Sequence, residues 1–230
     1  MSTAPSSDAH RYVHPDPDRL AAWRRVYDNY LVVTDIYESL ARRFAALGVR
    51  RFAEIGGGRG PISELLDAMT VVLDRDEEMI AECPRSAVRG DLRALPFAAS
   101  SFDGVAAINC LYFLDDPRVA LGEARRVLRP GGVFVASSPS RWNDPELEGI
   151  DPNWGAASSF DSESAPALVS SVFGDVDVEP WSVVAYVLPD RAAIADYLHA
   201  FNVRDWAARA AEIEPPLSIT KVGASVWSHA

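Results

Sequence analysis

The chain has 230 residues, a length that fits one ordinary domain, and with 48% hydrophobic and 24% charged residues it has the composition of a globular protein. It carries 22 basic and 33 acidic side chains, so its formal net charge is −11. Nucleic acid and anionic membrane attract a surplus of positive charge, so this composition argues against both as partners. The sequence leaves a homodimer open.

Residues 1–16 are rich in Ser, Ala, Pro and Asp, and we expect them to form a mobile arm. They contain no basic stretch followed by an apolar core, so they do not resemble a secretory signal. No apolar run of the sequence reaches transmembrane length. Elimination therefore predicts a cytoplasmic protein. Cys83 and Cys110 belong to no Cys-x-x-Cys pair or cysteine–histidine cluster, so we expect no metal site.

Residues 17–49 are predicted to form an N-terminal helical cap. In the second half of this stretch, apolar side chains recur at three- and four-residue steps and so share one helix face. These are Val33, Ile36, Tyr37, Leu40, Phe44 and Leu47. Gly48 then ends the helix, because glycine is the common residue just beyond a helix C-terminus.

From 50 to 140, short apolar runs alternate with helical segments. The predicted strands are 51–55, 70–74, 87–89, 102–109 and 132–138. The predicted helices are 61–69, 76–82 and 117–128. Such alternation indicates βαβ units. It predicts an α/β fold with a doubly wound, mainly parallel Rossmann-like sheet that has helices on both faces.

The remainder, 141–230, is predicted to hold a lid and the C-terminal strands. The segment 138–160 is rich in Pro, Gly and Ser, and long irregular loops of this kind are often functional lids. Two long strands, 176–187 and 217–227, enclose a helix over 191–201. The alternation of the last strand predicts an antiparallel addition to a sheet of about seven strands. We expect residues 17–230 to form a single domain.

A glycine-rich turn follows the first predicted strand and opens a helix. It reads Glu54-Ile55-Gly56-Gly57-Gly58-Arg59-Gly60-Pro61. Glycines let the backbone turn sharply and approach a ligand closely, although a tight turn without a ligand has the same composition. The next strand ends at Asp74, whose carboxylate can accept hydrogen bonds from ribose hydroxyls or cap the following helix. The two features at this distance favour an adenosine ligand.

The spacing of the glycines separates this turn from a dinucleotide-binding loop. Loops that bind NAD read Gly-x-Gly-x-x-Gly, whereas this one reads Glu-x-Gly-x-Gly-x-Gly. Pro61 also removes one of the N–H groups that a pyrophosphate would use at a helix N-terminus. Lys221 is the one lysine of the chain and belongs to no Tyr-x-x-x-Lys pair. An NAD-dependent oxidoreductase is therefore disfavoured.

Four motifs together resemble the class I S-adenosylmethionine-dependent methyltransferases, specifically the UbiE-like small-molecule group. The glycine turn and Val72-Leu73-Asp74 are similar to the first two motifs. Gly90-Asp91-Leu92-Arg93-Ala94-Leu95-Pro96-Phe97, followed by Ser101-Phe102-Asp103, is similar to the adenine-binding stretch. Arg125-Arg126-Val127-Leu128-Arg129-Pro130-Gly131-Gly132 is similar to the turn before the fifth strand. The resemblance implies methyl transfer from S-adenosylmethionine to a small-molecule acceptor, at O, N or C, in secondary metabolism.

The resemblance also implies a set of cofactor-binding residues. These are Glu54, Gly56, Gly57, Gly58, Gly60, Asp74, Arg75, Asp91, Leu92 and Asn109. Asp91 is expected to accept the exocyclic amine of adenine, with stabilisation of its own turn as the alternative. Leu92 is expected to line an apolar slot for the ring. Glu54 either orients the glycine turn or meets the cofactor's ammonium group.

Acceptor contacts are less well defined by the sequence. Phe113 stands where the resembling family frequently has histidine, so no catalytic residue is identified and His-assisted O-methylation is in doubt. The candidate substrate residues are Tyr30, Tyr112, Trp142 and Trp154, with core packing or loop anchoring as the alternative. Intact cofactor motifs without a base also fit a non-catalytic S-adenosylmethionine-binding scaffold or sensor.

Overall fold

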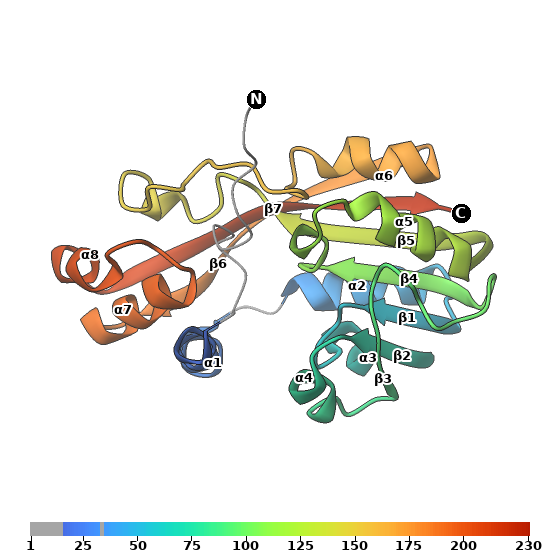
Figure 1. Cartoon of the computed structure of the whole chain (residues 1–230), viewed down its shortest axis with the longest axis horizontal. Coiled ribbons are helices and arrows are strands. Elements are labelled where there is room, and N and C mark those ends of the chain that lie inside the picture. The colour runs from blue at the N-terminus through green and yellow to red at the C-terminus, as the bar shows by residue number, and fades with distance from the viewer. Residues whose placement is uncertain (1–15, 33–34) are drawn as a thin grey trace. The chain divides into compact units, whose positions relative to one another are not determined.

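The structure, a computed structural model, describes residues 16–32 and 35–230 (Figure 1). Contacts divide these residues into two compact units, which we call unit 1 and unit 2. Unit 1 contains the described residues up to 32 together with 141–158 and 182–222, and unit 2 contains 35–140, 159–181 and 223–230. The organisation of 17–230 as a single domain stays a prediction. The expected arm, except its last residue, lies outside the described residues.

Seven strands form one sheet in the order β3-β2-β1-β4-β5-β7-β6 (Figure 1). Their bounds are β1 Arg51–Ile55, β2 Met69–Asp74, β3 Ala87–Arg89, β4 Phe102–Ile108, β5 Leu128–Pro139, β6 Val176–Leu188 and β7 Leu217–His229. The pairs β1–β2, β1–β4, β2–β3 and β4–β5 are parallel, and β7 pairs antiparallel with β5. The predicted mainly parallel sheet with an antiparallel last strand is confirmed.

The helices of unit 2 are α2 Asp35–Ala46, α3 Pro61–Leu65, α4 Glu77–Ala81, α5 Pro117–Val127 and α6 Ala165–Phe173. Those of unit 1 are α1 Pro17–Tyr30, α7 Arg191–Ala200 and α8 Trp206–Glu212. The sequence did not predict α6 and α8. Both helices are short, and their apolar side chains are buried by packing against other parts of the fold. The predicted helix 61–69 is too long, because the chain is extended from Leu66 and Met69 already pairs with Arg51 in the sheet.

Helices pack on both faces of the sheet in unit 2. On one face, Val133 and Val135 of β5 belong to a core that contains Phe44 of α2. On the other face, Phe134 stacks on Phe173 of α6 with ring centroids 4.6 Å apart. Successive strand residues point to opposite faces, so this alternation shows the doubly wound arrangement. Leu47 is 48% exposed beyond the end of α2, so its predicted place in the apolar stripe is wrong.

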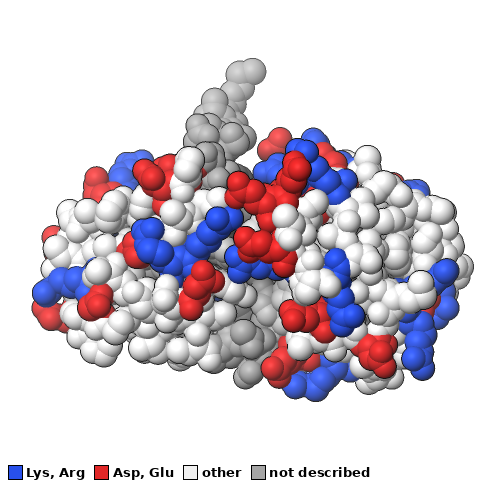
Figure 2. Space-filling model, turned by 90° about the horizontal axis from the view of Figure 1, so that it is seen from below, with Lys and Arg blue, Asp and Glu red and all other residues white. Residues whose placement is uncertain are grey.

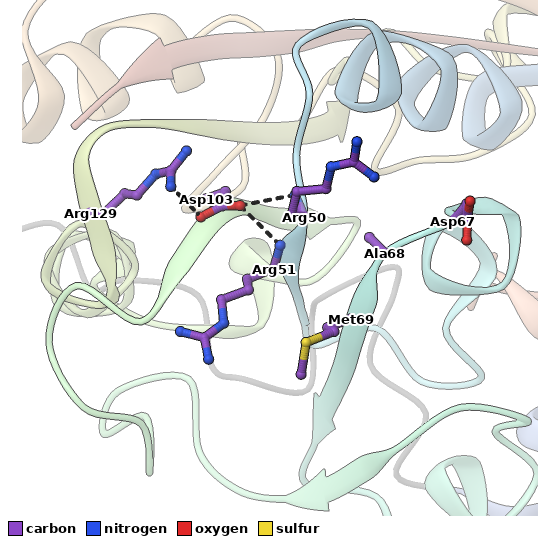
Figure 3. Close-up of a pocket in the computed structure, with 7 residues that line it drawn as sticks. All are labelled: Arg50, Arg51, Asp67, Ala68, Met69, Asp103 and Arg129. Carbon is purple, nitrogen blue, oxygen red and sulfur yellow. Dashed lines mark hydrogen bonds and ion pairs between the residues drawn. The ribbon is translucent and has the colours of Figure 1, made fainter.

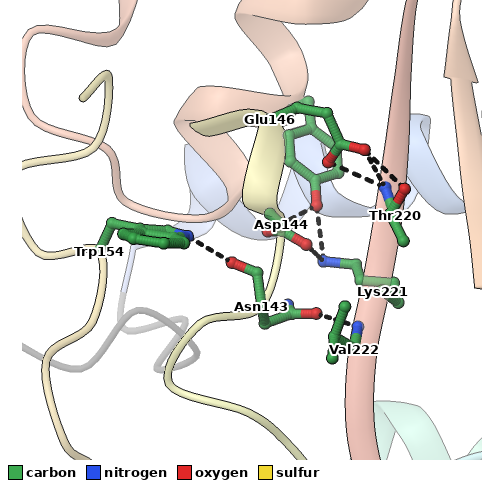
Figure 4. Close-up of polar contacts among 8 residues, drawn as sticks. Asn143, Asp144, Glu146, Trp154, Thr220, Lys221 and Val222 are labelled. Atoms are coloured by element: carbon green, nitrogen blue, oxygen red, sulfur yellow. Dashed lines mark hydrogen bonds and ion pairs between the residues drawn. The ribbon is translucent and has the colours of Figure 1, made fainter. Parts of the chain in front are cut away.

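Unit 1 has a core of its own, in which α1 packs against α7 and α7 against α8. Residues of the predicted lid that belong to this unit are hydrogen-bonded to β7 (Figure 4). The Glu146 carboxylate accepts hydrogen bonds from the amide and hydroxyl of Thr220, and Asn143 Oδ1 accepts one from the Val222 amide. Within the described residues, no helix has the length and apolar character needed to cross a membrane.

Candidate cofactor site

The candidate site of unit 2 lies where the direction of the strand order reverses. From β1 the chain continues to β2 on one side, and from β4 it continues to β5 on the other. Ligands of open α/β sheets bind at the carboxyl ends of the strands at such a switch point. The glycine turn follows β1 and Cys110 follows β4, and a Cβ built on Gly56 would lie 2.6 Å from the Cys110 Cβ. The two turns therefore meet at this point.

Three glycines of the turn have backbone conformations that other residues rarely adopt. The φ angles of Gly56, Gly58 and Gly60 are +65°, +53° and +75°. Gly57 has no room for a side chain, since a Cβ there would lie 2.6 Å from Glu54 Cγ. The tight turn thus requires glycine whether or not a ligand is bound, and the composition of the turn alone does not identify the ligand.

The N–H groups of the turn are used inside the protein. The Gly56 and Gly57 amides both donate to the Leu73 carbonyl, and the Gly60 amide donates to the Gly57 carbonyl. The Gly58 amide donates to Oδ2 of Asp74 at 2.9 Å. A pyrophosphate-binding loop instead directs its amides at the anion. The hydrogen bonding therefore agrees with the sequence in disfavouring a dinucleotide.

Asp74 connects the end of β2 to the glycine turn. Besides the bond from Gly58, its Oδ1 accepts a hydrogen bond from the Asp76 amide at 3.0 Å. The cap of α4 is Asp76, whose Oδ1 accepts from the amides of Glu78 and Met79. The capping alternative for Asp74 is therefore wrong. Its carboxylate is half-buried, and each oxygen retains a lone pair for a ribose hydroxyl.

Glu54 lies beneath the turn and is 1% exposed. Its Oε2 accepts a hydrogen bond from the Ser63 amide at 2.8 Å and its Oε1 one from the Ile62 amide at 3.3 Å, both at the start of α3. Burial raises the pKa of Glu54 to about 7, although these N–H bonds act in the opposite direction. The geometry corresponds to the alternative in which Glu54 orients the turn.

Asp91 follows β3 at the same edge of the sheet, and its carboxylate is paired with Arg93. Its Oδ1 accepts from the Arg93 amide at 2.8 Å, and its Oδ2 pairs with the Arg93 guanidinium at 2.6 Å. Hydrogen bonds from Arg93 hold the pKa of Asp91 at about 2. The turn-stabilising role is thus present, and an adenine amine would compete with Arg93. The neighbouring Leu92 reaches the glycine turn, and Arg75 is exposed just after Asp74.

Asn109 supplies the test of whether the site fits S-adenosylmethionine. It follows β4 with φ +53°, and its Oδ1 is buried with no hydrogen-bond partner among the described residues. A buried acceptor without a donor costs about 1–3 kcal/mol, so an unused one at the switch point indicates a missing donor. The ammonium and hydroxyl groups of S-adenosylmethionine are donors of the required kind. The residues present therefore fit this cofactor.

Two positions near the motifs are corrected by the structure. Asp103, which ends the stretch that resembles the adenine-binding motif, lies at the start of β4 and hence at the amino edge of the sheet. It cannot contact a ligand at the carboxyl edge, because β4 separates the two edges. Met79 of α4 was not predicted, yet its Cε lies 3.1 Å from a Cβ built on Gly58. Only the proximity of α4 to the turn reveals it.

The candidate substrate residues lie in different units. Tyr112 belongs to unit 2, is 6% exposed, and lies with its ring centroid 4.7 Å from that of Phe113. Tyr30, Trp142 and Trp154 belong to unit 1. Trp142 is 49% exposed and contacts Trp154 edge-on, while Trp154 Nε1 donates to the Asn143 carbonyl (Figure 4). Trp154 thus anchors its loop, as the alternative interpretation predicted.

Comparison with known proteins shows what this core is similar to. Residues 53–136 match the model of a methyltransferase domain family. A probable S-adenosylmethionine-dependent methyltransferase of Mycolicibacterium smegmatis is 36% identical over 114 residues, which cover 46% of this chain and 43% of the relative. The UbiE ubiquinone/menaquinone biosynthesis C-methyltransferase of Roseobacter denitrificans is 31% identical over 154 residues, which cover 56% of this chain and 62% of that protein.

The solved structure of the [4+2]-cyclase SpnF has the same fold, with a TM-score of 0.54 and 16% identity over 94% of this chain and 86% of that one. The order of the strands in the sheet is that of a Rossmann-like fold. Over the matched residues, the core is similar to S-adenosylmethionine-dependent methyltransferases, and UbiE proteins are among its relatives. The chain spans 43% and 62% of the lengths of the two relatives.

Proposed function

We propose that the chain transfers a methyl group from S-adenosylmethionine to a small-molecule acceptor of secondary metabolism. The observation that carries this proposal is the bond between Asp74 and the Gly58 amide at the switch point, beside the unused acceptor of Asn109. These groups belong to the matched domain. The hydrogen bond connects the carboxylate that is proposed to bind the ribose to a turn whose amides are bonded within the protein and are not directed at a phosphate.

The residues of this site have separate tasks in holding the cofactor. Asp74 accepts hydrogen bonds from the ribose hydroxyls, Leu92 packs against the adenine and Asn109 Oδ1 accepts from the methionine part. Glu54 keeps the turn in place through α3. When bound, S-adenosylmethionine supplies a methyl group that is already activated for in-line displacement by an acceptor lone pair. The contribution of the chain is then to position the acceptor and exclude water.

No general base is assigned to the reaction. Phe113 is 36% exposed at the position where histidine is frequent in the family, and a phenylalanine ring cannot accept a proton. This favours an acceptor that is nucleophilic without assistance. Among the aromatic candidates, we propose Tyr112 of unit 2, which lies beside Phe113, as an acceptor contact, because aromatic rings bind planar or apolar substrates well.

The fold itself does not impose methyl transfer, since the neighbour SpnF is described as a cyclase. The alternative is a non-catalytic S-adenosylmethionine-binding scaffold or sensor. The test is incubation of the protein with methyl-labelled S-adenosylmethionine and a panel of amine, phenol and carbon-acid metabolites. Label in any product supports the proposal. Binding of S-adenosylhomocysteine by calorimetry without labelled product supports the alternative, and binding of NADH in its place contradicts both.

A further inference from the structure

Unit 2 contains a cavity of about 630 Å³ at the amino edge of the parallel strands (Figure 3). Its lining residues lie at or just before the starts of β1, β2, β4 and β5, and they are Arg50, Arg51, Asp67, Ala68, Met69, Asp103 and Arg129. The glycine turn, Asp74 and Asn109 lie at the carboxyl ends of these strands. The cavity is therefore separate from the candidate cofactor site, and neither the family match nor the proposed function accounts for it.

Asp103 forms the polar centre of this cavity, and its charge is already neutralised. Its side chain is 8% exposed. Oδ2 accepts hydrogen bonds from the backbone amides of Arg50 and Arg51 at 2.9 and 3.1 Å, and Oδ1 pairs with the Arg129 guanidinium at 3.0 Å (Figure 3). Asp103 and Arg129 therefore fix the backbone that carries the other two arginines.

The guanidinium groups of Arg50 and Arg51 are available to a ligand. Figure 3 shows both side chains turned away from Asp103, in different directions. Among the described residues, neither guanidinium is paired with a carboxylate, although the chain has 33 acidic against 22 basic side chains. Elsewhere, arginines such as Arg43 and Arg93 are paired. Figure 2 shows both signs of charge interspersed on one face of the molecule, and the lining of this cavity contains Asp67 as well as the two arginines.

The cavity also has an apolar wall. Met69 is 71% exposed at the start of β2, and the preceding Ala68 is half-buried. A methionine side chain is flexible and polarizable, so it adapts to apolar ligands of different shape. Apolar surface beside unmatched arginines suits a molecule that has both an apolar body and a negative charge.

We propose that this cavity binds an organic anion, a small molecule that carries a carboxylate or a phosphate on an apolar body. A volume of about 630 Å³ is in the range of small-molecule sites. An acidic macromolecule is a poorer candidate, because the net charge of −11 repels its many negative charges more strongly than the single anionic group of a small ligand. The guanidinium of either Arg50 or Arg51 binds the anionic group, since the two side chains point in different directions, and Met69 contacts the apolar body.

The positions of the methionines provide a direct test. The chain has three methionines, Met1, Met69 and Met79. With ¹³C-labelled methionine methyl groups, Met69 reports on this cavity, while Met79, which lies against Gly58, reports on the cofactor turn. The signals are assigned with Met69→Leu and Met79→Leu. The probes are octanoate and octyl phosphate, with 1-octanol and inorganic phosphate as controls that lack the charge or the apolar body.

At low ionic strength, where exposed charges are least screened, we expect octanoate or octyl phosphate to shift the Met69 signal and leave Met79 in place. Saturation with S-adenosylhomocysteine should leave this binding intact. Loss of both guanidiniums in Arg50→Gln/Arg51→Gln should weaken it about tenfold or more, because hydrogen bonds to charged groups are the strong ones. Arg42→Gln, an exposed arginine on α2 paired with Glu38, is the matched control and should bind normally.

The relative affinities of octanoate and octyl phosphate show which anionic group the site prefers. Four results overturn the proposal: no Met69 shift with either anion, equal affinity for 1-octanol, full affinity in the double variant, or displacement of the anion by S-adenosylhomocysteine. None of them bears on methyl transfer, because the cofactor site is read independently at Met79.

Discussion

The Gly58 amide donates a hydrogen bond of 2.9 Å to Oδ2 of Asp74, so the turn after β1 is tied to the end of β2. The carboxylate thus shapes the turn from within the protein before any ligand is bound. The same group is proposed to accept hydrogen bonds from ribose hydroxyls with its remaining lone pairs. Loss of Asp74 should therefore affect cofactor binding through both the contact and the turn.

The first prediction is that Asp74→Ala weakens binding of S-adenosylhomocysteine by about tenfold or more. Hydrogen bonds to charged groups contribute about 1.5–3 kcal/mol each, and about 1.4 kcal/mol corresponds to one decade in the dissociation constant. Isothermal titration calorimetry measures the change. Asp76→Ala is the control, since it removes the cap of α4 and should lower stability while leaving the dissociation constant unchanged. Equal affinity of Asp74→Ala and the parent chain would restrict Asp74 to a structural role.

The second prediction concerns Glu54, which titrates near pH 4.5 in an unfolded chain and near 7 in the fold. Between these values the folded chain holds a proton that the unfolded chain has lost. The free energy of unfolding should therefore fall as the pH rises from about 5 to 7, by on the order of 2–3 kcal/mol from this group, and level off above. Glu54→Gln should remove this dependence. Urea unfolding at several pH values tests it, and parallel pH profiles for both proteins would contradict it.

The third prediction compares alanine substitutions at two glycines with similar backbone angles. It separates the backbone strain of a left-handed conformation from the steric collision of a new Cβ. Gly56 has φ +65° and Gly131 φ +75°, so alanine at either position adopts a left-handed conformation at a cost of about 1–2 kcal/mol. Only at Gly56 would the new Cβ collide with Cys110, whereas at Gly131 no atom lies within 4 Å. Gly56→Ala should therefore destabilise more and also weaken S-adenosylhomocysteine binding. If both variants keep the parent affinity, the turn does not form the cofactor site.

The part of this site that the sequence predicted is the part encoded by neighbouring residues. The glycine turn and Asp74 each end a strand, and parallel strands bring their carboxyl ends to one edge of the sheet. Asp103 shows the limit of this reasoning. It lies close in sequence to Asp91 within one motif, yet a strand advances about 3.3 Å per residue, so the start and end of β4 lie on opposite edges. The stretch that resembles the adenine-binding motif therefore has residues at both the amino and the carboxyl edge of the sheet.

Side-chain conformations, exact helix ends and contacts between distant segments were beyond the sequence. The occupation of Asp91 by Arg93 depends on a side-chain rotamer, and the choice of Asp76 rather than Asp74 as a cap depends on where α4 begins. The division into two units depends on segments far apart in the chain, such as Asn143 and Val222, which are hydrogen-bonded in unit 1. No local pattern encodes such pairs, because they are selected by the packing of the finished fold.

The last prediction concerns the one lysine of the chain. In unit 1, Lys221 Nζ lies 2.7 Å from Oδ1 of the fully buried Asp144 and donates to the Tyr197 hydroxyl at 2.6 Å (Figure 4). The Tyr197 hydroxyl in turn donates to Asp144 Oδ2 at 2.9 Å. Removal of one partner from a buried ion pair leaves an uncompensated charge, which costs about 3–5 kcal/mol. Lys221→Met should lower the free energy of urea unfolding by this amount.

The double variant Asp144→Asn/Lys221→Met should recover much of the loss, because no buried charge then remains and asparagine tolerates the positive φ of +57° at this position. Arg25→Gln, which breaks the exposed pair with Asp196, is the matched control and should change stability by less than about 1 kcal/mol. If the double variant is as unstable as Lys221→Met, the loss comes from the contact of the lysine ammonium group with the Phe201 ring rather than from the stranded carboxylate.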